Sequence, residues 1–430
     1  MSVPITYNIR NLIERKATTL MTALGIGLTV AVLVTAMALV AGLDSVFAGS
    51  GDARQVLVLR KGVNAELSST VSGDTYQIIR RLPGIATDAS GEPMVSPEAL
   101  TVVNLPSVDS PEGMNVSVRG MLPIGLSMRT FKIEQGSMFS PGLRQVVVGQ
   151  SIARRYPDAQ IGKKVKFGRG MWEVVGVFSA GESASNSEIW ADLNQLRGDF
   201  EQEGGSSSLL VRMNISVADA QKELEAAEKV AAAENRKRDA LISAGKKPEE
   251  VPPVDPPLPA MMAALRKTVA DDQRLGSDVM SEKAYYASMT SSGDVLKYLG
   301  YGVSVIMAIG SAFAATNTMY AAVSRRTREI GTLRALGFGR GAILRSFMLE
   351  SIFLAFVGGV LGILITLPIN GMSTAVGSFV TFSEVAFKFR IGWDAIAYGL
   401  IFAVLIGVVG GFLPAYAASK RGIVAAMRDL

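Results

Sequence analysis

The sequence predicts an α-helical membrane protein with four transmembrane helices and a large α+β extracytoplasmic domain between the first and second spans, carrying a helical hairpin insertion. Hydrophobic residues make up 49% of the 430 residues and charged residues only 19%, which is too apolar for an ordinary soluble protein. Four long segments lack any charge. A long segment between the first two has the Gly- and Pro-punctuated pattern of a folded domain.

The four uncharged segments are each long enough to cross a bilayer, whose hydrocarbon core of about 30 Å requires about 20 apolar residues. They lie between Lys16 and Asp44, Lys297 and Arg325, Glu350 and Glu384, and Asp394 and Lys420. We predict spans at residues 18 to 43, 295 to 323, 346 to 371 and 393 to 417. We also expect no Asp, Glu, Lys or Arg inside any span, which argues against an ion or proton pathway.

The first segment has a second interpretation, a cleaved signal peptide, because VFAGS at residues 46 to 50 resembles a cleavage site. Its apolar stretch exceeds the roughly 7–15 residues of a signal peptide. We therefore expect it to remain as an anchor.

Basic residues flank the predicted spans on one side of the membrane, and such residues are retained in the cytoplasm. They precede the first span, fill the loop from 324 to 345, and follow the fourth span. Both termini are therefore expected in the cytoplasm, with residues 44 to 294 and the loop at 372 to 392 outside. Residues 1 to 17 have the spacing of an interfacial amphipathic helix, and residues 418 to 430 form a cytoplasmic tail.

Composition also excludes several kinds of chemistry. The net charge of +5 lies largely in the basic flanks, so no nucleic-acid partner is predicted. The chain has no Cys and no His, which removes disulfides, thiol chemistry, imidazole catalysis and most zinc sites. No phosphate-binding loop is present. We predict no catalytic residue, no metal site and no cofactor in this chain.

The outer segment divides into two parts. Residues 44 to 215 are expected to form an α+β core domain, with helices at 73 to 82 and 149 to 157. Its strand-like segments are RQVLVLR (54 to 60), NVSVRGM (115 to 121), RQVVVG (144 to 149), KKVKFG (163 to 168), MWEVVGVF (171 to 178) and SLLVRM (208 to 213).

Residues 216 to 294 are expected to form a helical hairpin and a return to the membrane. Apolar residues recur at spacings of three and four from Val217 to Ala231, with Ser216 as the cap. Closely spaced prolines then break the helix before spacing resumes at Met261. The hairpin is either a charged surface insertion without a specific role or an arm that docks a partner.

The loop SRRTREIGTLRALGFGRGAILRS (324 to 346) has six arginines and one glutamate. Its apolar residues Ile330, Leu333 and Leu336 have helical spacing and precede a Gly-rich turn. Simple positive-inside anchoring does not require this apolar pattern, so we favour a short cytoplasmic lever that a partner moves. In the third and fourth spans, glycines four residues apart predict close helix packing, at Gly358, Gly362, Gly407 and Gly411.

Together, the arginine-rich loop, the opening NIRNLIERKATTLMTALGIGLTVA, the ending GGFLPAYAASKRGIVAAMRDL and the outer segment from 136 to 180 closely resemble the MacB/FtsX-like family of ABC transporter permeases. The stretch from 226 to 262 looks like an insertion relative to that pattern. The resemblance implies a bacterial inner-membrane subunit that pairs with a second permease copy or a paralogue. It also implies a separate cytoplasmic ATPase, which binds ATP and Mg, because this chain lacks a nucleotide-binding domain.

The resemblance further implies that the helix after the second span couples the permease to the ATPase. The residues that match this helix are Arg325, Arg326, Arg328, Glu329, Ile330, Gly331, Leu333, Arg334, Ala335, Leu336 and Gly337. Their basic side chains would pair with ATPase carboxylates, while Ile330, Leu333 and Leu336 would supply buried area. Motion transmitted to the outer domain would then export or extract an amphiphilic, lipid, lipoprotein or peptide cargo, with membrane lipids and possible periplasmic adaptor or cargo-binding proteins as partners.

Two alternatives stay open from the sequence. One is a regulatory scaffold, as FtsX-like relatives are, which activates an extracytoplasmic hydrolase without moving cargo. The other is a membrane sensor or receptor whose outer domain binds a ligand and signals inward.

Overall fold

The computed structural model describes residues 16 to 108, 110 to 201, 204 to 247, 251, 258 to 289, 291 to 377 and 383 to 420. The chain divides into two compact units. We call Met1–Leu43, Gly293–Thr374 and Lys388–Leu430 the membrane unit, and Asp44–Ser292 with Ala375–Phe387 the outer unit. The predicted helix at residues 1 to 17 and most of the tail at 418 to 430 lie outside the described residues.

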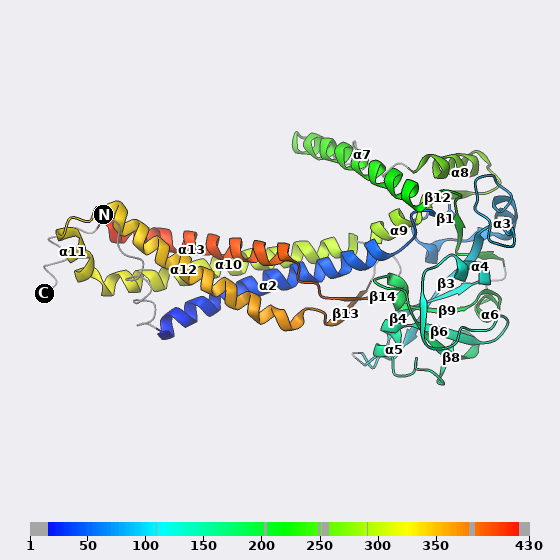
Figure 1. Cartoon of the computed structure of the whole chain (residues 1–430), viewed down its shortest axis with the longest axis horizontal. Coiled ribbons are helices and arrows are strands. Elements are labelled where there is room, and N and C mark those ends of the chain that lie inside the picture. Colours follow the sequence, from blue (N-terminus) through cyan, green and yellow to red (C-terminus); the bar gives the residue numbers. More distant parts are fainter. Residues whose placement is uncertain are drawn as a thin grey trace. The chain divides into compact units, whose positions relative to one another are not determined.

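The membrane unit is built from long helices that run side by side (Figure 1). They are α2 (Lys16–Gly49), α10 (Ser291–Arg325), α12 (Arg340–Thr366) and α13 (Trp393–Lys420). Within the described residues, four helices are long and apolar enough to cross a membrane: Thr19–Gly49, Lys297–Arg325, Arg340–Ile369 and Trp393–Lys420. Apolar residues of α2, α12 and α13 share one core, which includes Val30, Ala355 and Ala403.

The third span differs from its prediction in one respect. Glu350 lies within the predicted span and within α12, and the predicted second and fourth spans contain Lys297 and Asp394, so the expectation that no ionisable residue lies inside any span is wrong. The Glu350 carboxylate is buried and accepts a hydrogen bond from Arg326. Ionisable residues in such segments usually pair with one another, as Glu350 does with Arg326.

The outer unit contains a ten-stranded mixed sheet among its described residues, with order β12-β1-β11-β3-β4-β9-β6-β8-β5 and β7 paired to β8. Neighbouring strands are antiparallel except for the parallel pairs β4/β9 and β6/β8. The strands are β1 (Gln55–Arg60), β3 (Val95–Leu105), β4 (Met114–Met121), β5 (Lys132–Gly136), β6 (Gln145–Gly149), β7 (Lys164–Phe167), β8 (Gly170–Ser179), β9 (Glu188–Asp192), β11 (Ser208–Arg212) and β12 (Ser277–Ser281).

All six segments with predicted strand character contain a strand, and the two predicted helices appear as α3 (Gly73–Ile79) and α5 (Gln150–Arg155). The pattern missed β3, β5, β9 and β12. Strand β3 contains Pro97 and Glu98, which are poor signals for a strand. Further helices are α4 (Pro123–Ser127), α6 (Leu193–Asp199) and α9 (Glu282–Met289), and a short pair joins β2 (Val71–Ser72) to β10 (Gly205–Ser206).

Two helices lie where the hairpin was expected, α7 (Val217–Ser243) and α8 (Ala260–Asp271). The Ser216 hydroxyl caps α7 by accepting the backbone N–H of Asp219 at 3.1 Å. Helix α8 buries Met262 and Leu265 in a core shared with β1 and β12. Residues 252 to 257 lie outside the described residues, so the hairpin as a whole stays a prediction.

The segment predicted as a loop at 372 to 392 contains two strands, β13 (Ser373–Gly377) and β14 (Glu384–Lys388), which pair with each other. Within the outer unit, Glu384 accepts hydrogen bonds at 2.8 Å from Arg155 and from the hydroxyl of Tyr156. The backbone N–H of Ala386 donates to the Ser187 hydroxyl at 2.8 Å. Side-chain contacts therefore hold this segment against α5 and the start of β9.

Candidate functional site

Helix α11 (Thr327–Ala335) lies between the end of α10 and the start of α12, within the arginine-rich loop. It ends where the sequence predicts a turn, because Gly337 has a φ of 91° that other residues rarely adopt. The backbone N–H of Gly337 donates to the carbonyl oxygen of Arg334 at 3.1 Å. The backbone N–H of Phe338 donates to the carbonyl oxygen of Leu333 at 3.1 Å. These bonds satisfy the last carbonyls of the helix.

The inner face of α11 is packed against the membrane unit. Ile330 is only 2% exposed and lies in a cluster with Val323 of α10, Phe347 of α12 and Ala415 of α13. Burying one side chain of this size stabilises the packing of α11 against the long helices by about 1.5–3 kcal/mol. Helix α11 is thus fixed to three of the long helices.

A buried ion pair fastens the beginning of α11. Nη1 of Arg326 donates to Oε2 of Glu350 at 3.0 Å, and the two side chains are only 5% and 6% exposed. Removing one partner of a buried pair leaves an uncompensated charge and typically costs about 3–5 kcal/mol. The pair therefore holds the junction of α10 and α11 against the first half of α12.

The outer face of α11 remains accessible. Among the predicted coupling residues, Arg325, Arg328, Glu329, Ala335, Leu336 and Gly337 are exposed, and Leu333 and Arg334 are half-buried. Leu336, the residue directly after α11, is 68% exposed. The accessible residues of this segment thus include both basic side chains and one large apolar side chain.

Three of the predicted coupling residues do not lie at the surface, and their contact with an ATPase stays a prediction. Arg326 and Ile330 are both buried against their own chain, and Gly331 is buried as well. The helical spacing of Ile330, Leu333 and Leu336 did not reveal which apolar residues face inward, because α11 is short and both faces contain apolar side chains. Docking through the exposed residues stays a prediction.

The predicted packing glycines lie at close helix contacts. A Cβ atom on Gly358 would lie 2.7 Å from the carbonyl oxygen of Ala23, and a Cβ atom on Gly362 would overlap the carbonyl oxygen of Gly27. Helix α12 therefore contacts the backbone of α2. A Cβ on Gly407 would lie 3.0 Å from the carbonyl oxygen of Ser351.

The fourth predicted glycine and one further glycine belong to the same contacts. A Cβ on Gly411 would strike the Ser351 side chain, so α13 also packs closely against α12 at this position. Gly27 was missed, although its spacing of four from Ala23 is the same small-residue signal.

The outer unit contains a buried charge cluster that no local pattern revealed. We call Glu66, Glu98, Arg119, Arg129 and Glu188 the buried charge cluster. Arg119 of β4 donates to Glu66 at 2.8 Å, to Glu98 at 2.9 Å and to Glu188 at 2.9 Å. Arg129 donates to both oxygens of Glu98, at 2.6 and 2.7 Å.

Electrostatics within this cluster favour the ionised carboxylates. Burial alone would raise the pKa of Glu66 and Glu188, but the charge and hydrogen bonds of Arg119 outweigh it and hold both pKa values below the usual range. Burial would likewise lower the pKa of Arg119, and the three carboxylates raise it instead. The cluster joins β3, β4 and β9 with the 66 to 68 turn through charged hydrogen bonds.

Comparison with known proteins covers both units. A model of the MacB-like periplasmic core domain matches residues 19 to 232, and a model of the FtsX-like permease C-terminal region matches residues 301 to 423. A macrolide export ATP-binding/permease protein MacB from Bdellovibrio bacteriovorus is 25% identical over 388 residues, which cover 87% of this chain and 53% of that relative. The MacB of Rhodopseudomonas palustris is 24% identical over 328 residues, 73% of this chain and 43% of that relative.

Two further proteins are similar to shorter parts of this chain. An uncharacterized ABC transporter permease, YknZ from Bacillus subtilis, is 37% identical over 112 residues, 26% of each chain. The crystal structure of the periplasmic region of MacB from Actinobacillus actinomycetemcomitans matches with 14% identity and a TM-score of 0.30, covering 43% of this chain and 86% of that one. The chain spans about half the length or less of these curated relatives.

Proposed function

Because this chain belongs to the MacB/FtsX-like family of ABC transporter permeases, we propose that it is the permease subunit through which a cytoplasmic ATPase drives motion of the outer unit. In this proposal the ATPase binds ATP and Mg, and this chain contributes no catalytic residue. A second permease copy or a paralogue completes the dimer. The cargo is an amphiphilic, lipid, lipoprotein or peptide molecule.

The packing of α11 against the long helices of the membrane unit is the observation that carries the proposal. A helix whose inner face is buried by Ile330 and tied down by the Arg326–Glu350 pair moves together with the helices that hold it. Arg325, Arg328 and Leu336, which lie on α11 or directly beside it, are exposed and would contact a partner. Force applied there would pass to α10 and α12 directly.

The packing of the long helices supports onward transmission. Glycines bring α12 to the backbone of α2 and bring α13 to the backbone of α12, so the helices have little room to slide without separating. Along the chain, α2 and α10 lead into and out of the outer unit. Rigid packing between the spans would convert a push on α11 into motion at both connections.

Affinity purification tests the proposal. The tagged full chain is recovered from native membranes in mild detergent, and retained proteins are identified by mass spectrometry. We expect a cytoplasmic ATPase with the wild-type chain, and a loss of about tenfold or more with Leu336→Asp, because the change places a charge in the apolar centre of the interface. Leu336 is exposed, so this variant spares the core of the membrane unit.

Val230→Asp is the matched control, since Val230 is an apolar residue of α7 that is 56% exposed. It should retain the ATPase at the wild-type level. Equal recovery of the ATPase with Leu336→Asp, or no ATPase with the intact wild-type chain, would contradict the proposal. A wall hydrolase recovered together with the ATPase would favour the regulatory scaffold over transport.

A further inference from the structure

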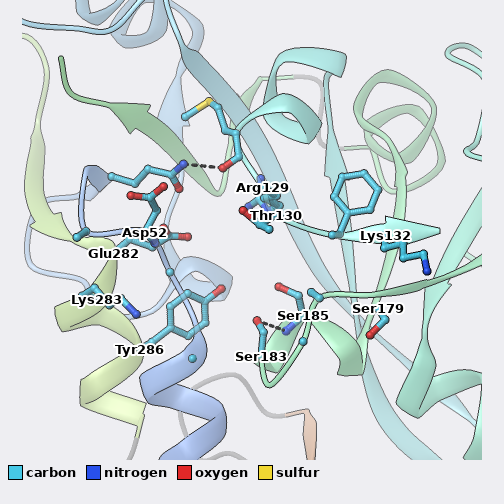
Figure 2. Close-up of a pocket in the computed structure, with 18 of the residues that line it drawn as sticks. Asp52, Arg129, Thr130, Lys132, Ser179, Ser183, Ser185, Glu282, Lys283 and Tyr286 are labelled. Carbon is cyan, nitrogen blue, oxygen red and sulfur yellow. Dashed lines mark hydrogen bonds between the residues drawn. The ribbon is translucent and has the colours of Figure 1, made fainter. Parts of the chain in front are cut away.

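A cavity of about 650 Å³ lies within the outer unit and is distinct from the α11 site (Figure 2). One wall comes from residues 49 to 55 and from α9, which are the segments where the chain enters and leaves this unit. The other wall comes from residues 128 to 134 and 179 to 185. Its volume lies in the range of sites that bind small organic molecules.

Glu282, the first residue of α9, lines this cavity and is only 5% exposed. Its Oε2 accepts the backbone N–H of Asp52 at 2.8 Å. Within the described parts of the chain, Oε1 of Glu282 and the hydroxyl of Tyr286 have no hydrogen-bond partner, and Tyr286 is also buried. Figure 2 shows both side chains on the same wall. Neither atom is fully enclosed by protein, so both reach the space of the cavity, where a ligand or solvent can bind them.

Two of the cations that line the cavity with Glu282 are each engaged by another acceptor. Arg129 binds both oxygens of Glu98, and Nζ of Lys283 donates to the carbonyl of Ala48 at 2.7 Å. The buried charge cluster behind Arg129 contains two arginines and three glutamates, so it already has one excess negative charge.

Asp52, the acid next to Glu282, is paired at 2.6 Å with Arg54 and at 3.7 Å with Arg212. An ionised Glu282 therefore lacks a counter-ion of its own.

The remaining walls combine aromatic rings with hydroxyl groups. Phe131 and Trp190 meet edge to face at 5.1 Å between ring centroids. Thr130, Ser179 and Ser183 line the opposite side with small polar groups (Figure 2). Aromatic faces attract cations, and hydroxyls bind polar substituents of any charge.

We propose that this cavity binds an organic cation that contains a protonated amine, with Glu282 as the counter-ion and Tyr286 and Phe131 as aromatic walls. An amine donates to the free oxygen of Glu282 and to the Tyr286 hydroxyl, which supplies the partners that both groups lack. The inference goes beyond the proposed ATPase coupling and does not depend on it.

Affinity for the cation should depend on pH through Glu282. Burial raises the pKa of Glu282 to about 7, because it outweighs the positive charge of Arg129, which acts to lower that pKa. A cation binds the ionised carboxylate, so affinity rises as the pH rises through this value and weakens about tenfold for each pH unit below it. Above the pKa the affinity should level off.

Calorimetric titration of the full chain in detergent tests the site with two probes, 1-naphthylmethylamine and its neutral isostere 1-naphthylmethanol. We expect the amine to bind at least about tenfold more tightly than the alcohol at about pH 8. Glu282→Gln should weaken amine binding by about tenfold or more and remove its pH dependence. The glutamine can still accept the Asp52 N–H, so alcohol binding should be unchanged and shows that the pocket is intact.

Glu134→Gln is the control, because Glu134 is an exposed carboxylate lining the same cavity. It should leave amine binding at the wild-type level. Equal binding of amine and alcohol, binding of neither probe, or an equal loss in Glu134→Gln and Glu282→Gln would each overturn the inference. None of these results requires the ATPase, so failure here is separate from failure of the proposed function.

Discussion

Two buried glutamates of the outer unit have opposite pKa shifts because their partners differ. Burial acts on both Glu188 and Glu282, but Glu188 receives hydrogen bonds from Arg119 and Trp190, which lower its pKa. Glu282 receives one backbone N–H, and burial raises its pKa to about 7. The same residue type is thus a structural anion in one place and a titratable group in the other.

The shift of Glu282 predicts how stability depends on pH. The unfolded chain releases this proton near the ordinary value of 4.5, whereas the folded chain retains it until about 7. The folded state binds more protons between these values, so the contribution is present below about pH 4.5 and is lost as the pH rises through about 7. Over this pH range, deprotonation of Glu282 lowers the free energy of unfolding by about 3 kcal/mol in total.

Glu282→Gln should remove this loss, since glutamine resembles the protonated acid. We expect wild type and variant to unfold at similar temperatures near about pH 5, and the variant to be more stable near about pH 8. Tryptophan fluorescence during heating measures this, because Trp172 and Trp190 are buried in the outer unit. A wild-type advantage at the higher pH would contradict the assignment. Glu134→Gln serves as the exposed control.

At the scale of elements, the crossing of α2 and α12 depends on backbone contact. Gly27 and Gly25 lie two residues apart on α2, but their surroundings differ. A Cβ on Gly27 would lie 2.9 Å from the carbonyl oxygen of Gly358, whereas one on Gly25 meets nothing within 4 Å. The two positions form a matched pair in one helix.

Alanine at each position separates packing from helix propensity. Gly25→Ala should be neutral or stabilising by up to about 1 kcal/mol, because alanine favours the helix. Gly27→Ala should destabilise by about 1–3 kcal/mol, because the added methyl group pushes the helices apart. Thermal unfolding of the purified chain measures both, and equal melting temperatures would show that the α2/α12 contact is not tight.

At the scale of the whole molecule, the basic flanks predict that α11 lies in the cytoplasm and that the outer unit lies outside. Cysteine labelling tests this directly, because the chain has no Cys and each introduced thiol is unique. Val230→Cys and Leu336→Cys place the thiol at exposed positions of α7 and of the segment after α11. In spheroplasts, a membrane-impermeant maleimide should label the first and not the second.

Denaturation in detergent after opening the membranes should make both thiols reactive, including one covered by a bound partner. Labelling of Leu336→Cys in intact spheroplasts, or protection of Val230→Cys, would reverse the assigned orientation. It would also remove α11 from the reach of a cytoplasmic ATPase.

Features that depend on local pattern could be predicted from the amino-acid sequence alone. Uncharged runs located the spans, alternation located six strands, and glycines spaced by four residues identified helix contacts such as that of Gly362. Apolar length, strand period and small-residue spacing act over a few turns or one strand, so a single segment contains the whole signal.

The pairing of charged residues became visible in the folded structure and had no local signal. Arg119 gathers glutamates from the 66 to 68 turn, β3 and β9, and Arg326 finds its partner 24 residues away in a span where no charge was expected. Tertiary packing also buries Ile330, which the sequence placed at an interface. It likewise places one carboxylate oxygen of Glu282 in the cavity without a partner among the residues that the structure describes. Such contacts join residues distant in sequence, and no local period encodes which of many charged or apolar side chains becomes the neighbour.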